Sequence, residues 1–303
     1  MHIHGLNRTA EGRDYMSTAM HIRAFFDPAT HTVSYVVADP ATKAAAIIDP
    51  VLDYDPCAGR TSTASMDLLL DHVRAEGLSP QWILETHVHA DHVSAGHTLR
   101  TLTGAKIGIG ARIVDVQKTF AALFNLKDLA TDGRQFDKLF ADGEDFTIGG
   151  LKGRVIHTPG HTPACVTYVI EDAAFVGDTM FMPDFGSARA DFPGACPSTL
   201  YRSVRKILAL PESTRIFCCH DYKAPGREDF AWETTVGQQR SENLHMRDGV
   251  SEQAFVEMRT ARDRTLKVPQ LLIPAIQINI RAGELPPAED NGIAYVKVPL
   301  NAV

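Results

Sequence analysis

The sequence predicts an α/β (α+β) protein built from two packed β-sheets with helices outside, and one doubly wound sheet is the alternative. Short runs of β-branched and aromatic residues alternate with amphipathic segments along most of the 303 residues. Apolar residues make up 44% and charged residues 22% of the chain, as in a globular protein with a full core. Neither a Gly-x-Gly-x-x-Gly turn nor a Walker loop follows an expected strand.

The first half of the chain predicts strands followed by alternating helices and strands. Met66, Leu69, Leu70 and Val73 recur at helical spacing, and Gly77 is a suitable residue to end that helix. In order, the expected elements are strands at residues 22–26, 32–37 and 44–48, a helix at 65–76, a strand at 82–86, a helix at 94–102, a strand at 106–109 and a helix at 112–123.

The second half continues with strands and then helices. The expected elements are strands at residues 154–157, 166–170 and 173–176, a helix at 199–208, a strand at 216–219 and a helix at 251–263. The apolar segment 271–280 fits either type.

Charge and cysteine content exclude several classes of function. The formal net charge is −7 and no basic cluster is present, so nucleic acid is not an expected partner. No apolar run approaches the ~20 residues that span a bilayer, and the start lacks the apolar core of a secretory signal, so no membrane partner is expected. Five cysteines in a chain of this size favour a reducing compartment, and we expect a cytoplasmic protein.

A cluster of imidazoles and a carboxylate follows the strand expected at 82–86. It contains His87, His89, Asp91 and His92. In an extended chain His87 and His89 point to the same side, and a turn would bring the other two residues to the same cavity. These residue types together suit Zn, Fe, Mn or Ni, whereas the alternative is a polar surface turn.

Three further turns at strand ends offer the same ligand types. His161 lies in a turn bounded by proline and glycine, Asp178 follows the strand expected at 173–176, and His220 follows the one at 216–219. Loops at strand ends, held by a rigid scaffold, are common places for metal sites. Taken together, the four segments predict one metal centre.

These segments, in this order, resemble the metallo-β-lactamase fold over about residues 22–222. They read His87-x-His89-x-Asp91-His92, Gly160-His161-Thr162, Gly177-Asp178-Thr179 and His220-Asp221-Tyr222. The resemblance implies an αββα sandwich of two mixed β-sheets with outer helices and the metal at one edge. The start of the chain shows no periodicity, so we expect a flexible tail at 1–18, followed by the main domain at 19–245 and a C-terminal extension at 246–303 packed on that domain.

Within that superfamily, residues 177–194 and 232–292 are similar to the persulfide dioxygenase group, particularly to bacterial members found with sulfide-responsive genes. That group oxidises glutathione persulfide or a similar low-molecular-weight persulfide with O2 to sulfite and thiol, in sulfide detoxification. The resemblance implies one Fe(II) per chain, bound by His87, His161 and Asp178, and it suggests a homodimer.

The roles of the remaining site residues depend on which group the chain joins. In a dioxygenase, His89, Asp91, His92 and His220 would orient ligands and water. In the alternative, a thioester hydrolase of the glyoxalase II type, they would complete a site for two Zn or Fe ions. A metal-binding sensor is a third possibility, disfavoured because no DNA-reading element is recognisable.

Candidate catalytic residues are Tyr222, His220 and Asp91. The Tyr222 phenol is placed to hydrogen-bond an atom bound to the metal, although a purely structural role is equally compatible with the sequence. Arg189 is expected to pair with an acid such as Asp221 and hold its loop, or to face a substrate carboxylate.

Overall fold

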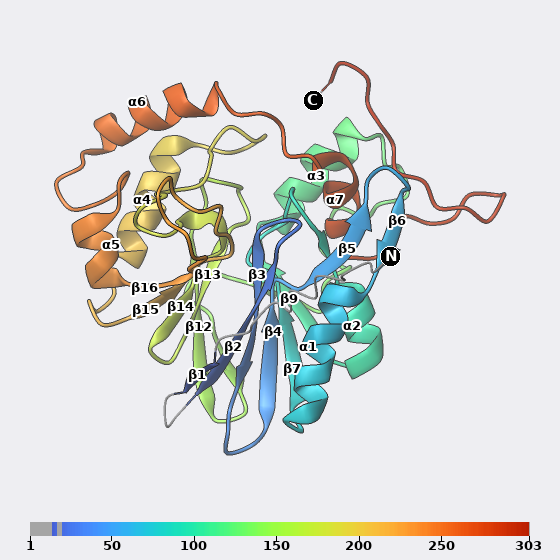
Figure 1. The fold of residues 1–303 in the computed structure, drawn as a ribbon. Helices are drawn as coiled ribbons and strands as arrows, with labels where there is room; N and C mark the ends of the chain where they lie inside the picture. Colours follow the sequence, from blue (N-terminus) through green and yellow to red (C-terminus); the bar gives the residue numbers. More distant parts are fainter. Residues whose placement is uncertain (1–13, 17–19, 303) are drawn as a thin grey trace, which may run out of the picture.

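Two β-sheets pack face to face in the middle of the molecule, and helices cover the outer face of each (Figure 1). The structure, a computed structural model, describes residues 14–16 and 20–302. The layers follow the order helices, sheet, sheet, helices. This confirms the αββα sandwich and excludes the single doubly wound sheet.

The first sheet has seven strands in the order β1-β2-β3-β4-β7-β9-β10. The strands from β4 to β10 run parallel to one another, whereas β1 to β4 pair antiparallel. Their bounds are β1 (Asp14–Met16), β2 (His21–Asp27), β3 (Thr32–Ala38), β4 (Ala44–Ile48), β7 (Ser79–Leu84), β9 (Lys106–Gly110) and β10 (Lys138–Phe140). A small sheet beside it contains β5 (Val51–Asp55), β6 (Arg60–Ser62) and β8 (Val93–Ser94).

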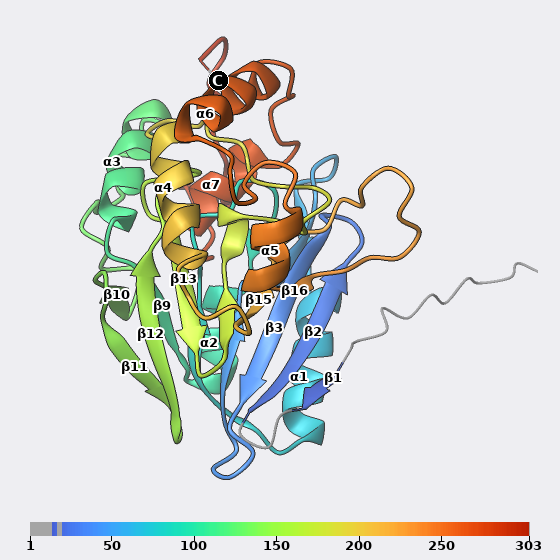
Figure 2. The ribbon, with the colours of Figure 1, turned by 90° about the vertical axis from the view of Figure 1, so that its left-hand side faces the viewer.

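The second sheet has six strands in sequential order. They are β11 (Asp145–Ile148), β12 (Leu151–His157), β13 (Val166–Ile170), β14 (Ala173–Phe175), β15 (Arg215–Phe217) and β16 (Glu233–Thr235). β14 and β15 run parallel, and the other neighbours are antiparallel. Figure 2 looks onto the outer face of this sheet, with α4 (Pro197–Ile207) and α5 (Val236–Glu242) lying in front of it.

Strand β3 shows how the sequence fills both faces of a sheet. Val33, Tyr35 and Val37 point into the core between the sheets, whereas Val36 and Ala38 point into the core under the helices. Successive side chains of a strand alternate between faces, so a strand covered on both sides is apolar throughout.

The remaining helices cover the two outer faces. α1 (Ala64–Ala75), α2 (Gly96–Thr103), α3 (Ile113–Leu123) and α7 (Leu272–Asn279) bury apolar side chains against the first sheet, and α6 (Glu252–Asp263) joins α4 and α5 on the second. A single 3-10 turn, η1 (Gly177–Thr179), follows β14. None of the helices within the described part of the chain has the length and apolar character of a membrane-spanning segment.

The predicted helices and strands are present, with ends that shift by a few residues. The ambiguous segment 271–280 contains α7. Sequence patterns missed β5, β6, β8, β10, β11, β16 and α5. Within the predicted tail, Asp14–Met16 form β1 and pair with β2, whereas residues 1–13 and 17–18 lie outside the described residues.

Helices α6 and α7 of the C-terminal extension pack on the main body. Phe255 of α6 shares a core with Leu200 and Val204 of α4. Ala275 and Ile278 of α7 join the core of the first sheet. The apolar run that begins at Leu271 is therefore buried within this chain.

Candidate metal centre

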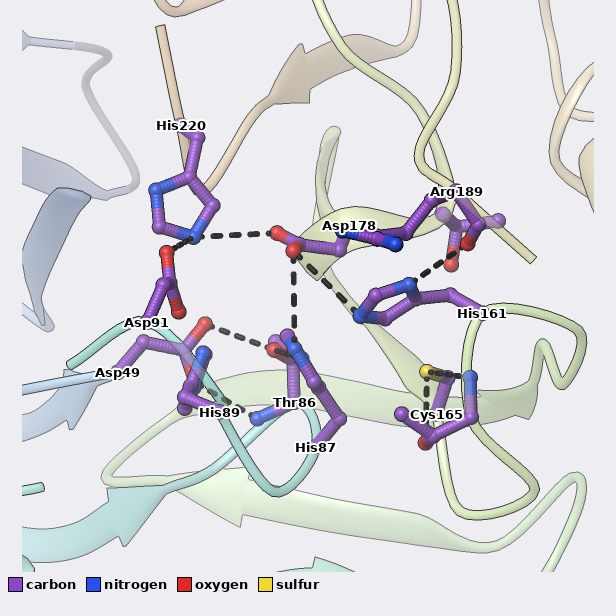
Figure 3. Close-up of polar contacts among 12 residues, drawn as sticks. Asp49, Thr86, His87, His89, Asp91, His161, Cys165, Asp178, Arg189 and His220 are labelled. Atoms are coloured by element: carbon purple, nitrogen blue, oxygen red, sulfur yellow. Dashed lines mark hydrogen bonds and ion pairs between the residues drawn. The ribbon is translucent and has the colours of Figure 1, made fainter. Parts of the chain in front are cut away.

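Four segments end at the same edge of the two sheets and carry the predicted ligands. The segment 85–92 follows β7, the turn with His161 follows β12, η1 with Asp178 follows β14, and His220 follows β15. The structure brings all of these residues together (Figure 3). Their clustering is the outcome that the sequence predicted.

His87, His161 and Asp178 form one buried group. Asp178 Oδ2 lies 3.8 Å from His87 Nε2 and 3.7 Å from His161 Nε2. Two atoms that bind one ion at about 2.1 Å each lie within about 4 Å of one another. Figure 3 shows both imidazoles directed at the Asp178 carboxylate, so the group has the spacing of ligands around one ion.

His89, Asp91, His92 and His220 form a second group, with one ligand atom from each within 4.8 Å of the others. His220 Nε2 lies 2.9 Å from Asp91 Oδ2 and 3.3 Å from Asp178 Oδ1. Asp178 thus stands between the two groups, with one oxygen facing each. The residue types and spacing for a second ion are also present.

Two of the imidazoles are oriented by hydrogen bonds from Nδ1 to backbone carbonyls. His161 Nδ1 donates to the Arg189 carbonyl at 2.8 Å, and His220 Nδ1 donates to the His31 carbonyl at 3.3 Å. Because a carbonyl only accepts, Nδ1 carries the proton of each neutral ring and Nε2 keeps the lone pair. Nε2 of each ring therefore faces the ligand groups.

Asp49, which was not among the residues predicted from the sequence, orients two further histidines. Its Oδ2 accepts from the Thr86 hydroxyl at 2.9 Å, so Thr86 Oγ1 is left to accept from His87 Nδ1 at 3.0 Å. Its Oδ1 accepts from His89 Nε2 at 2.9 Å. His87 therefore presents Nε2 to the centre and His89 presents Nδ1. The available signal was an acid directly after strand β4, the same signal that identified Asp178.

A hydroxyl relay orients His92 in the same way. Asp27 Oδ2 accepts from the Thr30 hydroxyl, which in turn accepts from the Thr32 hydroxyl at 2.8 Å. Thr32 Oγ1 is then left to accept from His92 Nδ1 at 3.2 Å. His92 thus also presents Nε2 as a lone pair.

The buried lone pairs fit a divalent cation. His87 Nε2, His89 Nδ1 and His92 Nε2 are fully buried and have no hydrogen-bond partner among the described residues. A buried polar atom without a partner costs about 1–3 kcal/mol. Since imidazole and carboxylate are metal ligands, an ion at this place satisfies these atoms, and the residues fit a metal.

The ligands differ in protonation. Burial opposes a charge on His89, but the carboxylates of Asp49 and Glu85 raise its pKa well above the usual value. Burial, together with the imidazoles of His89 and His161, lowers the pKa of His87 well below its usual value, so its ring is neutral. Burial opposes a charge on His220, but the carboxylates of Asp178 and Asp91 raise its pKa to about 9. An ion bound at His220 Nε2 must therefore displace a proton at neutral pH.

A cavity of about 610 Å³ lies against the first group. His161, Asp178 and Asp91 contribute to its lining, and the aromatic side chains of Phe181, Phe185, Phe192 and Tyr222 form part of its wall. Residues 259–271 of the C-terminal extension supply Arg259, Arg262 and Lys267 to the same lining. The volume lies in the range of sites for small molecules.

Tyr222 lines this cavity beside the metal ligands. Its ring stacks on His220, with 5.5 Å between centroids and 15° between planes. The residue as a whole is 39% exposed, but desolvation of the phenol within the cavity and the carboxylates of Asp91 and Asp178 raise its pKa well above the usual value. The hydroxyl is therefore protonated at neutral pH and able to donate.

Arg189 lines the cavity but does not pair with Asp221 as suggested. Its Nε and Nη2 bond to Asp191 at 2.6 and 2.8 Å, and Nη1 donates to the Lys267 carbonyl at 2.7 Å. Asp221 pairs instead with Arg227, at 2.6 Å from each of two guanidinium nitrogens. The expected structural pairing of Arg189 is present with a nearer acid, and the Asp221 partner was wrong because Arg227 is closer along the loop.

The fold and the ligand set define a class of metalloprotein. Residues 27–220 match the metallo-beta-lactamase superfamily, and the chain belongs to that superfamily.

Relatives within the superfamily carry different names. Glyoxylase B2 of Dictyostelium discoideum is 53% identical over 94% of this chain and 99% of its own. The mitochondrial persulfide dioxygenase ETHE1 of Homo sapiens is 31% identical over 86% of this chain and 88% of its own. The crystal structure of ETHE1 from Myxococcus xanthus superimposes with a TM-score of 0.69 at 28% identity and covers 87% of this chain and 99% of that one.

Proposed function

We propose that the protein is a persulfide dioxygenase that oxidises glutathione persulfide, or a similar small persulfide, in sulfide detoxification. His87, His161 and Asp178 would hold one Fe(II), because two imidazoles and one carboxylate with open positions are typical of non-haem iron oxygenases. The observation that carries the proposal is that these three ligands lie beside a cavity large enough for a small molecule. The chain is also similar to persulfide dioxygenases over most of its length.

In the proposed reaction, a persulfide RSSH, O2 and one water give the thiol RSH, sulfite and two protons. The outer sulfur loses four electrons, and O2 takes them up. When bound, Fe(II) supplies the redox chemistry with O2. The chain itself fixes the ligand lone pairs through Asp49, Arg189 and His31, and it holds the reacting sulfur in a cavity with aromatic walls.

The cations of the C-terminal extension support an anionic substrate. Arg262 and Lys267 line the cavity, and within residues 20–302 neither side chain forms an ion pair with an acid. A carboxylate at this wall would gain charge-assisted hydrogen bonds. Glutathione carries two carboxylates, so its persulfide suits a cavity with metal ligands at one part of the lining and free cations at another.

Tyr222 would donate a hydrogen bond to the substrate sulfur or to an oxygen of the product. Its protonated hydroxyl and its place beside His220 support that role. With Asp91 and His220, it completes the set of candidate catalytic residues.

The second candidate is a thioester hydrolase of the glyoxalase II type. The group of His89, Asp91, His92 and His220 supports it because these residues could hold a second ion. The 53% identity to a protein named Glyoxylase B2 supports it as well. The four residues of that group would hold the second ion beside His87, His161 and Asp178, and two bound ions would supply Lewis-acid chemistry for the hydrolysis of a thioester.

Metal content and product analysis separate the two candidates. Freshly purified protein should contain about one iron per chain, consume O2 with glutathione persulfide and release sulfite. The His161→Ala variant serves as the inactive control, because it lacks a ligand. Two metals per chain, fast hydrolysis of S-lactoylglutathione and no sulfite would replace the proposal with the hydrolase.

Charge-removing variants test the substrate class. Arg262→Ala and Lys267→Ala should each raise KM for glutathione persulfide about tenfold or more, since a hydrogen bond to a charged group contributes about 1.5–3 kcal/mol. Arg264→Ala is the matched control, because Arg264 is exposed and does not line the cavity. Equal KM values in all three variants would exclude carboxylate recognition at this wall.

A further inference from the structure

One side chain of the C-terminal helix α7 holds the histidine segment in shape. Asn279 Nδ2 donates to the carbonyls of His89 at 2.9 Å and His92 at 2.8 Å. Its Oδ1 accepts from the Ser94 backbone N–H at 2.8 Å. The amide is buried, and both of its donor hydrogens and its acceptor are used in bonds to this segment.

The segment needs such support because it lacks regular structure. Between the end of β7 and the start of β8, residues 85–92 form neither helix nor strand. Asp49 and Thr32 hold the side chains of His89 and His92 from one direction. Asn279 holds the carbonyls of the same two residues, so together these contacts fix both the backbone and the ring of each histidine.

We propose that Asn279 is a positioning residue of the metal centre, through which α7 sets the spacing of His89 and His92. Asn279 lies outside residues 27–220, the part of the chain that matches the superfamily. The proposal rests on the presence of a metal centre, but it holds whether the reaction is persulfide oxidation or thioester hydrolysis. An affinity measurement with Zn²⁺ tests it without any turnover.

The same helix offers a matched control. Gln277 is also buried, its Nε2 donates to the carbonyls of Ile273 and Lys297 at 2.9 Å each, and its Oε1 accepts from the Lys297 N–H at 2.9 Å. It therefore makes as many hydrogen bonds as Asn279 but none to the histidine segment. Replacing either amide by the corresponding carboxylate removes both donors with little change in shape.

Asn279→Asp should weaken Zn²⁺ binding about 10–100-fold, the usual cost of losing a group that orients metal ligands. Gln277→Glu should bind Zn²⁺ with an affinity within about threefold of the wild type, although both variants lose buried hydrogen bonds. The affinities are measured by competition with a chromogenic chelator on metal-stripped protein. Electrostatic attraction between the added negative charge and a cation would by itself raise the affinity of Asn279→Asp, which is opposite to the expected result.

A second pair and a wild-type measurement keep the test decisive if a carboxylate variant does not fold. Asn279→Leu and Gln277→Leu repeat the comparison without a charge. In the wild type, Zn²⁺ should slow amide hydrogen exchange in α7 while exchange in α1 stays the same, because coupling between two sites is reciprocal. Equal Zn²⁺ affinities within each folded pair, or α7 exchange that Zn²⁺ does not change, would overturn the proposal.

Discussion

Removing the Arg227 guanidinium, which is largely buried, should destabilise the protein more than removing the guanidinium of an exposed arginine. Arg227 donates to both carboxylate oxygens of Asp221 at 2.6 Å and to Asp184 Oδ2 at 2.7 Å. Asp221 is 2% exposed and lies between His220 and Tyr222. The guanidinium therefore joins the His220 segment to the loop that contains Asp184, and the Arg227→Met variant would break that connection.

The magnitude follows from what the variant leaves behind. Breaking a buried pair by removing one partner costs about 3–5 kcal/mol, because the remaining charge is buried without compensation. Asp221 keeps bonds from the N–H groups of Ala231 at 2.7 Å and Lys223 at 3.1 Å, which reduce this penalty. We expect a loss of about 3 kcal/mol, the lower end of that range. Adding Asp221→Asn removes the charge and should recover about half of the loss.

Urea denaturation followed by far-UV circular dichroism measures the effect, provided that the slope with denaturant matches the wild type. Arg134→Met is the control, because Arg134 forms an equally short ion pair with Asp132 but both side chains are exposed. That variant should unfold close to the wild-type midpoint. A loss below about 1 kcal/mol in Arg227→Met, or no recovery in the double variant, would refute the reasoning.

Three further predictions concern the ligands and pH. His161→Ala should lose most of its metal, measured by elemental analysis, and full occupancy would exclude His161 as a ligand. His220→Ala should keep about one iron per chain but lose ~10–100-fold in O2 consumption; loss of all iron would contradict the one-ion reading. Burial and the nearby cations of Arg259 and Arg262 lower the pKa of His245 from 6.5 to about 4, and its Nδ1 accepts from the Ser187 N–H. As the pH falls, the unfolded chain therefore takes up this proton before the folded chain does. The free energy of unfolding then decreases between pH 6.5 and about 4, by up to about 1.4 kcal/mol per pH unit. In a plot of the free energy of unfolding against pH, His245→Gln should have a smaller slope over this range.

Local patterns were enough to predict most elements of the fold. Helix α1 is an example. Gly77 lies just beyond its end and adopts φ +62°, as expected for a residue that ends a helix. The secondary structure of segment 271–280 could not be assigned from the sequence, because α7 is buried on nearly all sides and its apolar residues are not confined to one face. The signal for α5 was present but overlooked: Thr235 and Gln238 form a capping box at its start.

The ligands were predictable because each lies at the end of a strand, whereas their supporting residues were not. Asp49 carries the same strand-end signal and could have been found. Asn279 contacts the histidine segment across a long sequence separation, and nothing in its immediate neighbours indicates that contact. Arg227 is only six residues from Asp221, but no sequence pattern singled it out as the partner of that acid. Arg189 pairs with Asp191, an acid only two residues away, which the sequence also offered.

Whether the site holds one ion or two depends on Asp178 more than on which other ligands are present. Its Oδ2 faces His87 and His161, and its Oδ1 lies 3.3 Å from His220. With one ion at Oδ2, the other oxygen would accept a hydrogen bond from a protonated His220, whose pKa of about 9 favours that state at neutral pH. With two ions, the Asp178 carboxylate would be a candidate ligand of both, and His220 would have to lose its proton. Both arrangements use identical residues, so residue identity alone does not separate oxygenase from hydrolase. The two functions differ in whether an ion bound by the second group displaces the proton of His220. The affinity for that ion also depends on the contacts that position His92 and Asp91.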